Sequence, residues 1–268
     1  MTETQKKFGY GNFGNLAEEY ELARQKYTSE VIDLLWALFK HQRKCFVLDL
    51  GCGTGISTRQ IFKKLQEENL ANHNILVVGC DKDPLMLEKA TAHPENRGES
   101  RLTYGVDNAE ALSFLDASFD AITAFGSFHW FTSQKAISEI KRVLTPEGFF
   151  FVVNKNDTDG FKNGFRKIIK DAVGEELPEI KKDYNAARIL DESGFRDIQT
   201  QHFICSELFT PEQALLYLQS VSIWNLVPTE KKEKTLNLLK EYCWDSSENG
   251  QVRRTIEVKA VFGWNSWE

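Results

Sequence analysis

The sequence predicts an α/β fold in which helices cover both faces of a mostly parallel sheet. Short apolar runs alternate with segments of helical apolar spacing through residue 155. A glycine-rich turn joins the first apolar run to a helical segment, and the 268 residues suit one α/β domain with appendages. In such a fold ligands bind in the crevice at the carboxyl ends of the strands.

The first predicted element is a helix from about Leu16 to Lys40, because apolar residues recur there at helical spacing. The period then changes, and Cys45 to Leu50 is predicted to be a buried strand. The glycine turn follows, and a helical stripe resumes at Ile56. These residues predict a strand, a tight turn and a helix in succession.

The remaining elements are predicted from the same two patterns, which are short apolar runs for strands and apolar residues at helical spacing for helices. A second buried strand, Ile75 to Cys80, is closed by Asp81, and Pro84 starts a short helix that extends to Ala92. Helices are expected at 133–144, 165–173 and 184–193 and after Pro211 and Thr229; strands are expected at 102–106, 119–125, 149–153, 198–206 and 255–262. Thr145 to Gly148 is expected to separate the 133–144 helix from the next strand.

The turn carries glycines at 51, 53 and 55, which let the backbone bend sharply and approach a ligand closely. Ile56 replaces the third glycine of a dinucleotide fingerprint, and Gly55-Ile56-Ser57 does not match a phosphate loop. Asp49 adds a negative charge beside the turn. That charge favours a ligand with an ammonium group over one with phosphates.

Asp81 closes the second strand, 32 residues after Asp49. A doubly wound sheet would place its carboxylate beside the glycine turn, where it can accept two ribose hydroxyl bonds. The alternative is that Asp81 caps the helix at Pro84, a role for which Asp83 is better placed. The ribose role is favoured.

Three stretches in order resemble the motifs of class I S-adenosylmethionine-dependent methyltransferases: Val47 to Gly55, Val78 to Asp81 and Arg142 to Phe149. The resemblance covers roughly residues 45 to 155. It implies a Rossmann-like, seven-stranded, mostly parallel sheet with an antiparallel last strand, and S-adenosyl-L-methionine as the cofactor.

The same resemblance implies a set of cofactor-binding residues. Asp49 and the turn at Gly51, Gly53 and Gly55 would hold the methionine end, Asp81 the ribose, and Met86 or Leu85 would pack on the adenine. Asn108 stands where the family has an aspartate that binds the adenine amino group, and Asp107 could compete for that role. Ala109 and Phe125 complete the predicted set.

Phe128-His129-Trp130-Phe131 resembles an element of the trans-aconitate and juvenile-hormone-acid methyltransferases. Ala17 to Tyr27 and Tyr217 to Trp224 are similar to two further elements of that group, although Gln25 and Val221 replace its proline and tryptophan. The resemblance implies a small organic acid as methyl acceptor. It also implies acceptor-side or catalytic roles for Tyr20, Arg24, His129 and Trp130.

The residues themselves leave these roles open. Tyr20, Arg24 and Tyr27 are expected to share one helix face, which could close over a carboxylate or could be ordinary packing around a solvated arginine. His129 could be a general base, a hydrogen-bond donor to the acceptor, or a histidine packed between aromatic rings. Alternatives to the carboxyl methyltransferase are an N- or O-methyltransferase for another small metabolite, a non-catalytic S-adenosylmethionine-binding protein, and a nicotinamide-dependent dehydrogenase.

The composition and charge of the chain indicate which binding partners and which cellular location to expect. The net charge is −6 and no basic cluster is interleaved with aromatic residues, which argues against nucleic acid. Met1 to Asn15 lacks an apolar signal core and no apolar run is long enough to span a bilayer, so a cytoplasmic protein without membrane insertion is expected. The scattered cysteines and histidines predict no metal.

The chain is expected to be one methyltransferase domain that binds a small-molecule acceptor. Residues 1–44 would form a helical N-terminal cover, 45–155 the cofactor-binding core, and 156–268 the acceptor-side helices with the last two strands. The sequence predicts no oligomeric state.

Overall fold

The computed structural model describes residues 11, 13–39, 44–68, 74–178 and 184–266. Its contacts divide the chain into two compact units. The first unit is made of residues 1–25, 156–182 and 204–257, and the second of residues 26–155, 183–203 and 258–268. The predicted division into a cover, a cofactor core and an acceptor side stays a prediction, and residues 1–10, 12 and 40–43 of the expected cover lie outside the described residues.

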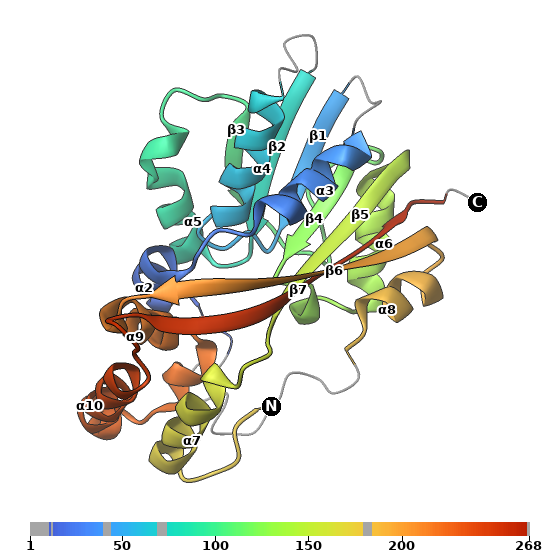
Figure 1. The fold of residues 1–268 in the computed structure, drawn as a ribbon. Coiled ribbons are helices and arrows are strands. Elements are labelled where there is room, and N and C mark those ends of the chain that lie inside the picture. The colour runs from blue at the N-terminus through green and yellow to red at the C-terminus, as the bar shows by residue number, and fades with distance from the viewer. Residues whose placement is uncertain (1–10, 12, 40–43, 69–73, 179–183, 267–268) are drawn as a thin grey trace. The chain divides into compact units, whose positions relative to one another are not determined.

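A seven-stranded sheet in the order β3-β2-β1-β4-β5-β7-β6 confirms the predicted fold class (Figure 1). Its strands are β1 (Lys44–Leu50), β2 (Asn74–Asp81), β3 (Leu102–Val106), β4 (Phe119–Phe125), β5 (Leu144–Asp157), β6 (Arg196–Phe209) and β7 (Val252–Trp264). The pairs β1–β2, β1–β4, β2–β3 and β4–β5 are parallel. β7 lies between β5 and β6 and is the antiparallel strand.

Strand order reverses between β1 and β4, because the chain adds β2 and β3 on one side of β1 and then returns to its other side. Such a switch point leaves a crevice at the carboxyl ends of the strands. Leu50, Asp81 and Phe125 are the last residues of β1, β2 and β4. The structure therefore brings the predicted cofactor-binding segments to one edge of the sheet.

Helices of the second unit cover both faces of the sheet, as the alternation of side chains along a strand requires. Leu48 of β1 and Phe150 of β5 share a buried cluster with Ile140 of α6 (Gln134–Val143) and Leu190 of α8 (Ala186–Glu192). Phe149 points to the other face and meets Phe39 of α3 (Ser29–Phe39) with ring centroids 5.0 Å apart. The helices α4 (Ile56–Glu67) and α5 (Pro84–Ala92) complete the covering of β1 to β3.

Strand β5 begins earlier than predicted. The sequence predicted a strand from residue 149 after a turn at Thr145 to Gly148, whereas β5 already pairs with β4 at Leu144. Leu144 lies opposite Phe119 and Phe149 opposite Ala121, so the residues between them form an irregularity in the ladder. The helix α6 ends before Thr145 as predicted, but residues 145–148 already belong to β5 and do not separate the helix from the strand.

The predicted helix from Leu16 to Lys40 is wrong at its centre. The chain instead forms η1 (Gly14–Leu16), α2 (Ala17–Ala23) and α3, and residues 24–28 are not helical. The side-chain amide of Gln60, in α4, bonds the backbone of Tyr27 in place of neighbouring helical backbone groups. It donates to the Tyr27 carbonyl at 2.9 Å and accepts from the Tyr27 N–H at 2.8 Å. Tyr27 therefore does not share a helix face with Tyr20 and Arg24. The expected end at Lys40 lies outside the described residues.

The described part of the first unit is mainly helical. It contains η1, α2, α7 (Phe161–Val173), α9 (Pro211–Gln219), η4 (Ser222–Leu226) and α10 (Thr229–Asp245), with the ends of β5, β6 and β7. A buried cluster joins Phe165 of α7, Leu218 of α9 and Leu239 of α10. α9 starts with a capping box, in which Thr210 and Gln213 satisfy each other's backbone N–H groups.

Candidate functional site

The glycine turn has the conformation that its sequence predicts. Gly51, Gly53 and Gly55 have φ values of 71°, 56° and 81°, in the left-handed region that residues with a Cβ seldom adopt. A Cβ at Gly51 would lie 2.6 Å from the Cβ of Ser127, and one at Gly55 would lie 2.7 Å from the Tyr104 hydroxyl. Ser127 and Tyr104 therefore leave no room for a side chain at Gly51 and Gly55, and the backbone of the turn is closely packed.

Asp49 is enclosed beneath this turn. It is 0 % exposed, and its carboxylate accepts hydrogen bonds of 2.7 Å from the hydroxyls of Ser57, Thr58 and Thr123. Burial raises the pKa of Asp49, and the three hydroxyl bonds oppose that rise. These bonds tie β1 to α4 and β4, and the predicted role of Asp49 at the methionine end stays a prediction.

Asp81 lies at the end of β2 with its carboxylate oriented by two backbone donors. One oxygen accepts from the N–H of Gly53 at 2.9 Å and the other from the N–H of Asp83 at 2.9 Å. Burial raises its pKa although these bonds lower it. Asp83 accepts from the N–H of Leu85 and caps α5, so the helix-capping alternative belongs to Asp83. Asp81 is left with unused acceptor capacity on each oxygen beside the glycine turn.

The residues predicted for the adenine differ in exposure. Met86 is buried at 3 % exposure, whereas Leu85 is 47 % exposed and is available for contact with a ligand. Asp107 accepts from both the N–H and the hydroxyl of Ser113, while the side-chain oxygen of Asn108 accepts from the N–H of Glu110. Asn108 is exposed and the adjacent Ala109 is half-buried, so the two remain candidates for the adenine.

The loop after β4 carries His129 and Trp130 in the short helix η3 (Phe128–Trp130). The His129 ring lies 4.9 Å from that of Trp130 and 6.0 Å from that of Tyr184. Asn154 donates to the Tyr184 hydroxyl at 3.2 Å, and burial raises the pKa of Tyr184 to about 12. His129 is half-buried between aromatic rings and Trp130 is 40 % exposed.

Three residues of this region were missed from the sequence. Ser127 donates to the carbonyl of Leu50 at 2.7 Å and so joins the fourth strand to the glycine turn. Tyr104 fills the space beside Gly55, and Tyr184 is distant in sequence from its neighbour His129. No local motif marks these contacts, since each depends on strand order.

Tyr20 and Arg24 belong to the first unit, whereas His129 and Trp130 belong to the second. Arg24 follows the last residue of α2, and its guanidinium lies 4.8 Å from the ring centre of Tyr20 and 4.6 Å from that of Tyr217. It donates to the hydroxyl of Ser220 at 2.9 Å and to the carbonyl of Ser220 at 3.2 Å. Among the described residues, no carboxylate pairs with Arg24.

Phe125, the last residue of β4, is buried between aromatic neighbours. Its ring lies 4.7 Å from that of Tyr27 and 6.1 Å from that of Phe151. The Nζ of Lys155 lies 4.4 Å from the centre of the Tyr27 ring. Tyr27 therefore packs at the carboxyl end of β4, away from the helix face that was expected to contain it.

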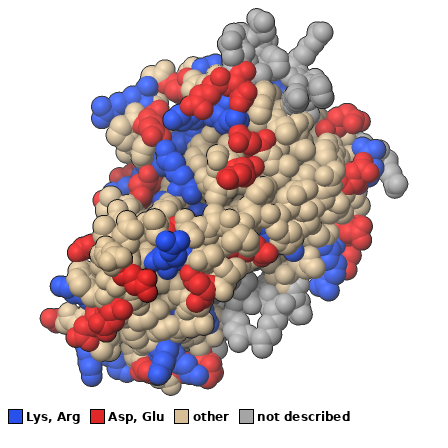
Figure 2. Space-filling view, viewed as in Figure 1, with Lys and Arg blue, Asp and Glu red and all other residues tan. Residues whose placement is uncertain are grey.

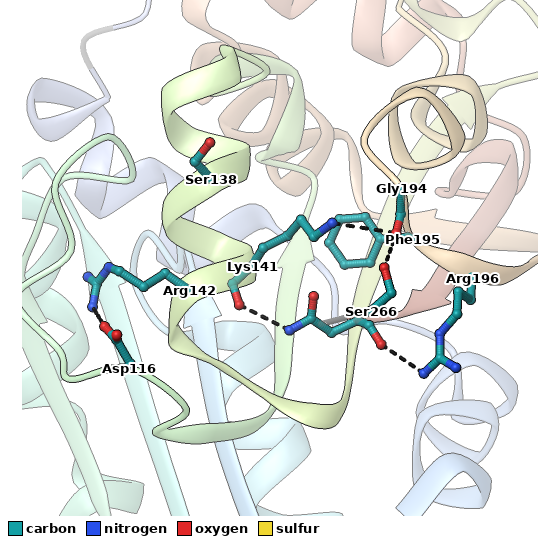
Figure 3. A pocket seen from close by; sticks show the side chains of 9 residues that line it. Asp116, Ser138, Lys141, Arg142, Gly194, Phe195, Arg196 and Ser266 are labelled. Atoms are coloured by element: carbon teal, nitrogen blue, oxygen red, sulfur yellow. Dashed lines mark hydrogen bonds and ion pairs between the residues drawn. The ribbon is translucent and has the colours of Figure 1, made fainter. Parts of the chain in front are cut away.

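A cavity of about 690 Å³ lies at the other end of the strands, near the starts of β5 and β6 (Figure 3). Its cations already have partners: Lys141 donates to the carbonyl of Ser193, Arg142 pairs with Asp116, and Arg196 donates to the carbonyl of Asn265. Because it is far along the strands from Asp81 and its charges are satisfied, we place no function there.

Within the described ranges, no three His, Cys, Asp or Glu side chains come close enough together to hold a metal ion. Within the same ranges, no helix has the length and apolar character needed to cross a bilayer. On the face drawn in Figure 2, lysines and arginines are interspersed with aspartates and glutamates.

Comparison with known proteins identifies a methyltransferase domain in the chain. Residues 47–148 match the methyltransferase domain family. An uncharacterized methyltransferase-like protein of Schizosaccharomyces pombe is 27% identical over 246 residues, which is 91% of this chain and 89% of that protein. The ubiquinone/menaquinone biosynthesis C-methyltransferase of Zymomonas mobilis is 35% identical over 151 residues, covering 55% of this chain and 58% of that protein.

Solved structures show the same fold. The YcgJ protein of Bacillus subtilis superimposes with a TM-score of 0.54 at 17% identity, over 90% of this chain and 100% of that one. Phosphoethanolamine N-methyltransferase 2 of Haemonchus contortus, in complex with S-adenosyl-L-methionine, gives a TM-score of 0.55 at 16% identity, over 100% of this chain and 61% of that one. Residues 47–148 thus carry a methyltransferase domain, and this domain, with the ordered motifs and the sheet topology, makes the chain an S-adenosylmethionine-dependent methyltransferase.

Proposed function

We propose that this enzyme methylates a carboxylate oxygen of a small organic acid. The observation that carries the proposal is the environment of Arg24, whose guanidinium is held between two tyrosine rings and has no carboxylate partner among the described residues. An arginine fixed in this way is suited to bind an anionic group of the acceptor. The resemblance of the His129-Trp130 loop to carboxyl-methylating enzymes supports the same acceptor class.

The cradle at the carboxyl edge fits S-adenosylmethionine. The glycine turn with its positive φ values would hold the methionine end, and Asp81 would accept from the ribose hydroxyls. Leu85 or Met86, with Asn108 and Ala109, would bind the adenine, and Phe125 would border the site. When bound, the cofactor supplies an electrophilic methyl group on a sulfonium.

With a carboxylate as acceptor, the enzyme has to orient the attacking oxygen and does not have to remove a proton from it. A carboxylate is ionised at neutral pH, so no general base is required. Arg24 and Tyr20 are the candidates in the first unit to orient it, and His129 and Trp130 are the candidates in the second. An amine or hydroxyl acceptor would instead have to lose a proton, and His129 would be the candidate base. The acceptor chemistry therefore decides the role of His129.

The chemistry can be tested before the acceptor is known. The enzyme is incubated with methyl-labelled S-adenosylmethionine and a panel of metabolite acids, and the product is treated with mild alkali. A methyl ester releases volatile labelled methanol, whereas methylated amines, ethers and carbon centres keep the label. Label that resists alkali would refute the carboxylate acceptor, and a parallel panel of amines would then identify N-methylation.

The same proposal names a small molecule as the partner and the cytoplasm as the location. Labelling of a metabolite extract, followed by separation of small from macromolecular products, tests the first. Fractionation of cells that express the tagged full chain tests the second, and recovery with membranes after a salt wash would contradict it.

A further inference from the structure

Tyr217 lies at the centre of a charged cluster inside the first unit. The residue is 1 % exposed, and its hydroxyl is buried without a hydrogen-bond partner among the described residues. Leaving a buried hydroxyl unpaired costs about 1–3 kcal/mol, so such a group calls for an explanation. A water, a bound ion or ligand, or a catalytic role can explain such a group.

Three cations surround the Tyr217 ring. The guanidinium carbons of Arg24 and Arg254 each lie 4.6 Å from the ring centre, and Lys162 Nζ lies 5.6 Å from it. Burial alone would raise the pKa of Tyr217, but Lys162, Arg24 and Arg254 hold it below its ordinary value. The hydroxyl therefore lies in a positive potential, which favours a negative charge beside it.

The carboxylates in the described part of the chain neutralise part of this charge. Arg254, which is 1 % exposed, pairs with Asp157 and with Glu207 at 2.7 Å, and Lys162 pairs with Asp157 at 2.8 Å. Burial disfavours the Asp157 carboxylate, but the bond from Arg254 holds its pKa below the ordinary value. Among the described residues, two carboxylates thus face three cations, and Arg24 is the cation without a carboxylate partner.

We infer that Arg24, Tyr217 and Lys162 form the binding site for the carboxylate of the acceptor. Arg24 supplies the unbalanced charge, the Tyr217 hydroxyl donates a hydrogen bond, and Lys162 adds to the field from α7. Arg254, with Asp157 and Glu207, is the fixed frame that holds β5, β6 and β7 around the tyrosine. This assignment rests on the proposed carboxyl methylation and adds the residues that recognise the acid.

The site also distinguishes substrate from product. Methylation converts a carboxylate into a neutral ester, so the product no longer balances the charge of Arg24. A neutral ester also accepts a weaker hydrogen bond from a phenol than a carboxylate does. The cluster should therefore bind the acid and release the ester.

Binding can be measured without turnover. We would titrate the full chain, saturated with S-adenosylhomocysteine, with hexanoate, and compare methyl hexanoate, hexanol and hexylamine by calorimetry. Hexanoate should bind at least about tenfold more tightly than the other three. Arg24→Met should weaken hexanoate about 10- to 100-fold, the scale of a charge-assisted bond, and Tyr217→Phe about two- to tenfold.

Matched variants control for charge and folding. Arg253→Met and Lys167→Met remove exposed cations of the same unit and should leave hexanoate affinity unchanged. Tyr217→Phe keeps the ring and loses a hydroxyl that has no partner among the described residues, so it should stay folded. Arg24→Lys keeps the charge and should lose less affinity than Arg24→Met.

Two outcomes would overturn the assignment: equal hexanoate affinity in Arg24→Met and Arg253→Met, or unchanged affinity in folded Tyr217→Phe. A failure of carboxyl methylation appears separately, as alkali-stable label. Alkali-labile product combined with unaffected hexanoate binding in the variants would leave the reaction standing and remove this site.

Discussion

Replacing Asp81 with alanine should weaken binding of S-adenosylhomocysteine about 10- to 100-fold. Each carboxylate oxygen of Asp81 already accepts one backbone N–H at 2.9 Å, which leaves capacity for the two ribose hydroxyls. Charge-assisted bonds of this kind contribute about 1.5–3 kcal/mol, and every 1.4 kcal/mol is a factor of ten in affinity. Titration calorimetry measures the loss directly.

The matched control is Asp83→Ala. It removes the cap of α5, a bond from the N–H of Leu85 to Asp83, and should lower the free energy of unfolding by about 0.5–2 kcal/mol. It should leave cofactor affinity intact. Asp81→Ala binding as tightly as the parent, in a folded protein, would show that the ribose does not lie at the end of β2.

The pH dependence of binding follows from the same carboxyl. Ribose hydroxyls donate to the ionised form of Asp81, so affinity is present above its pKa and is lost as the pH falls through it. Burial raises that pKa, so the loss should begin at a higher pH than for an ordinary aspartate. Asp81→Asn should abolish this dependence, and an equally steep acid loss in that variant would assign it to another group.

Three further predictions concern the fold and its accessibility. Gly55→Ala should lower the free energy of unfolding by at least about 1 kcal/mol, because the new Cβ would lie 2.7 Å from the Tyr104 hydroxyl at a φ of +81°. Gly98→Ala has a similar φ of +76° but no atom within 4 Å of the new Cβ, so it should cost less. Equal losses of stability in chemical denaturation would show that the contact with Tyr104 is irrelevant. Of the five cysteines, half-buried Cys205 should react first with a thiol reagent in the native state and the four buried ones only after unfolding, which mass spectrometry of the labelled peptides can contradict. The segment up to Tyr27 should become more resistant to limited proteolysis when S-adenosylhomocysteine binds, and unchanged cleavage would argue against a cover that orders with the cofactor.

The sequence predicted those features that depend on neighbouring residues. The strands at 102–106 and 119–125 and the helix at 84–92 have the predicted bounds, because turn residues mark their ends. The positive φ values at Gly51, Gly53 and Gly55 and the cap at Asp83 also follow from local rules. These are the features for which one residue type is strongly preferred at one backbone conformation.

Features that depend on distant partners were not predictable. No glycine or proline marks the break after Ala23, and helical spacing continues through it; the carboxamide of Gln60, 33 residues from Tyr27, holds the chain out of a helix. The carboxylate of Asp49 looked available beside the turn, but three hydroxyls enclose it. Tyr217 lies in a motif noted from the sequence, yet the cations around it come from three distant segments, namely the loop after α2, α7 and β7.

The two compact units alternate along the chain, and this limits how such an enzyme can be re-engineered or can have diversified. The units are built from six successive stretches, and three of the five junctions, after residues 155, 203 and 257, fall inside β5, β6 and β7. A chimera that took one unit from a relative would therefore need junctions within hydrogen-bonded strands. A one-residue error in register there would move the buried side chains of the strand to the opposite face of the sheet. Neither unit can be transplanted as a cassette, and a new acceptor preference is more accessible through substitutions at positions such as 24, 162 and 217 than through recombination.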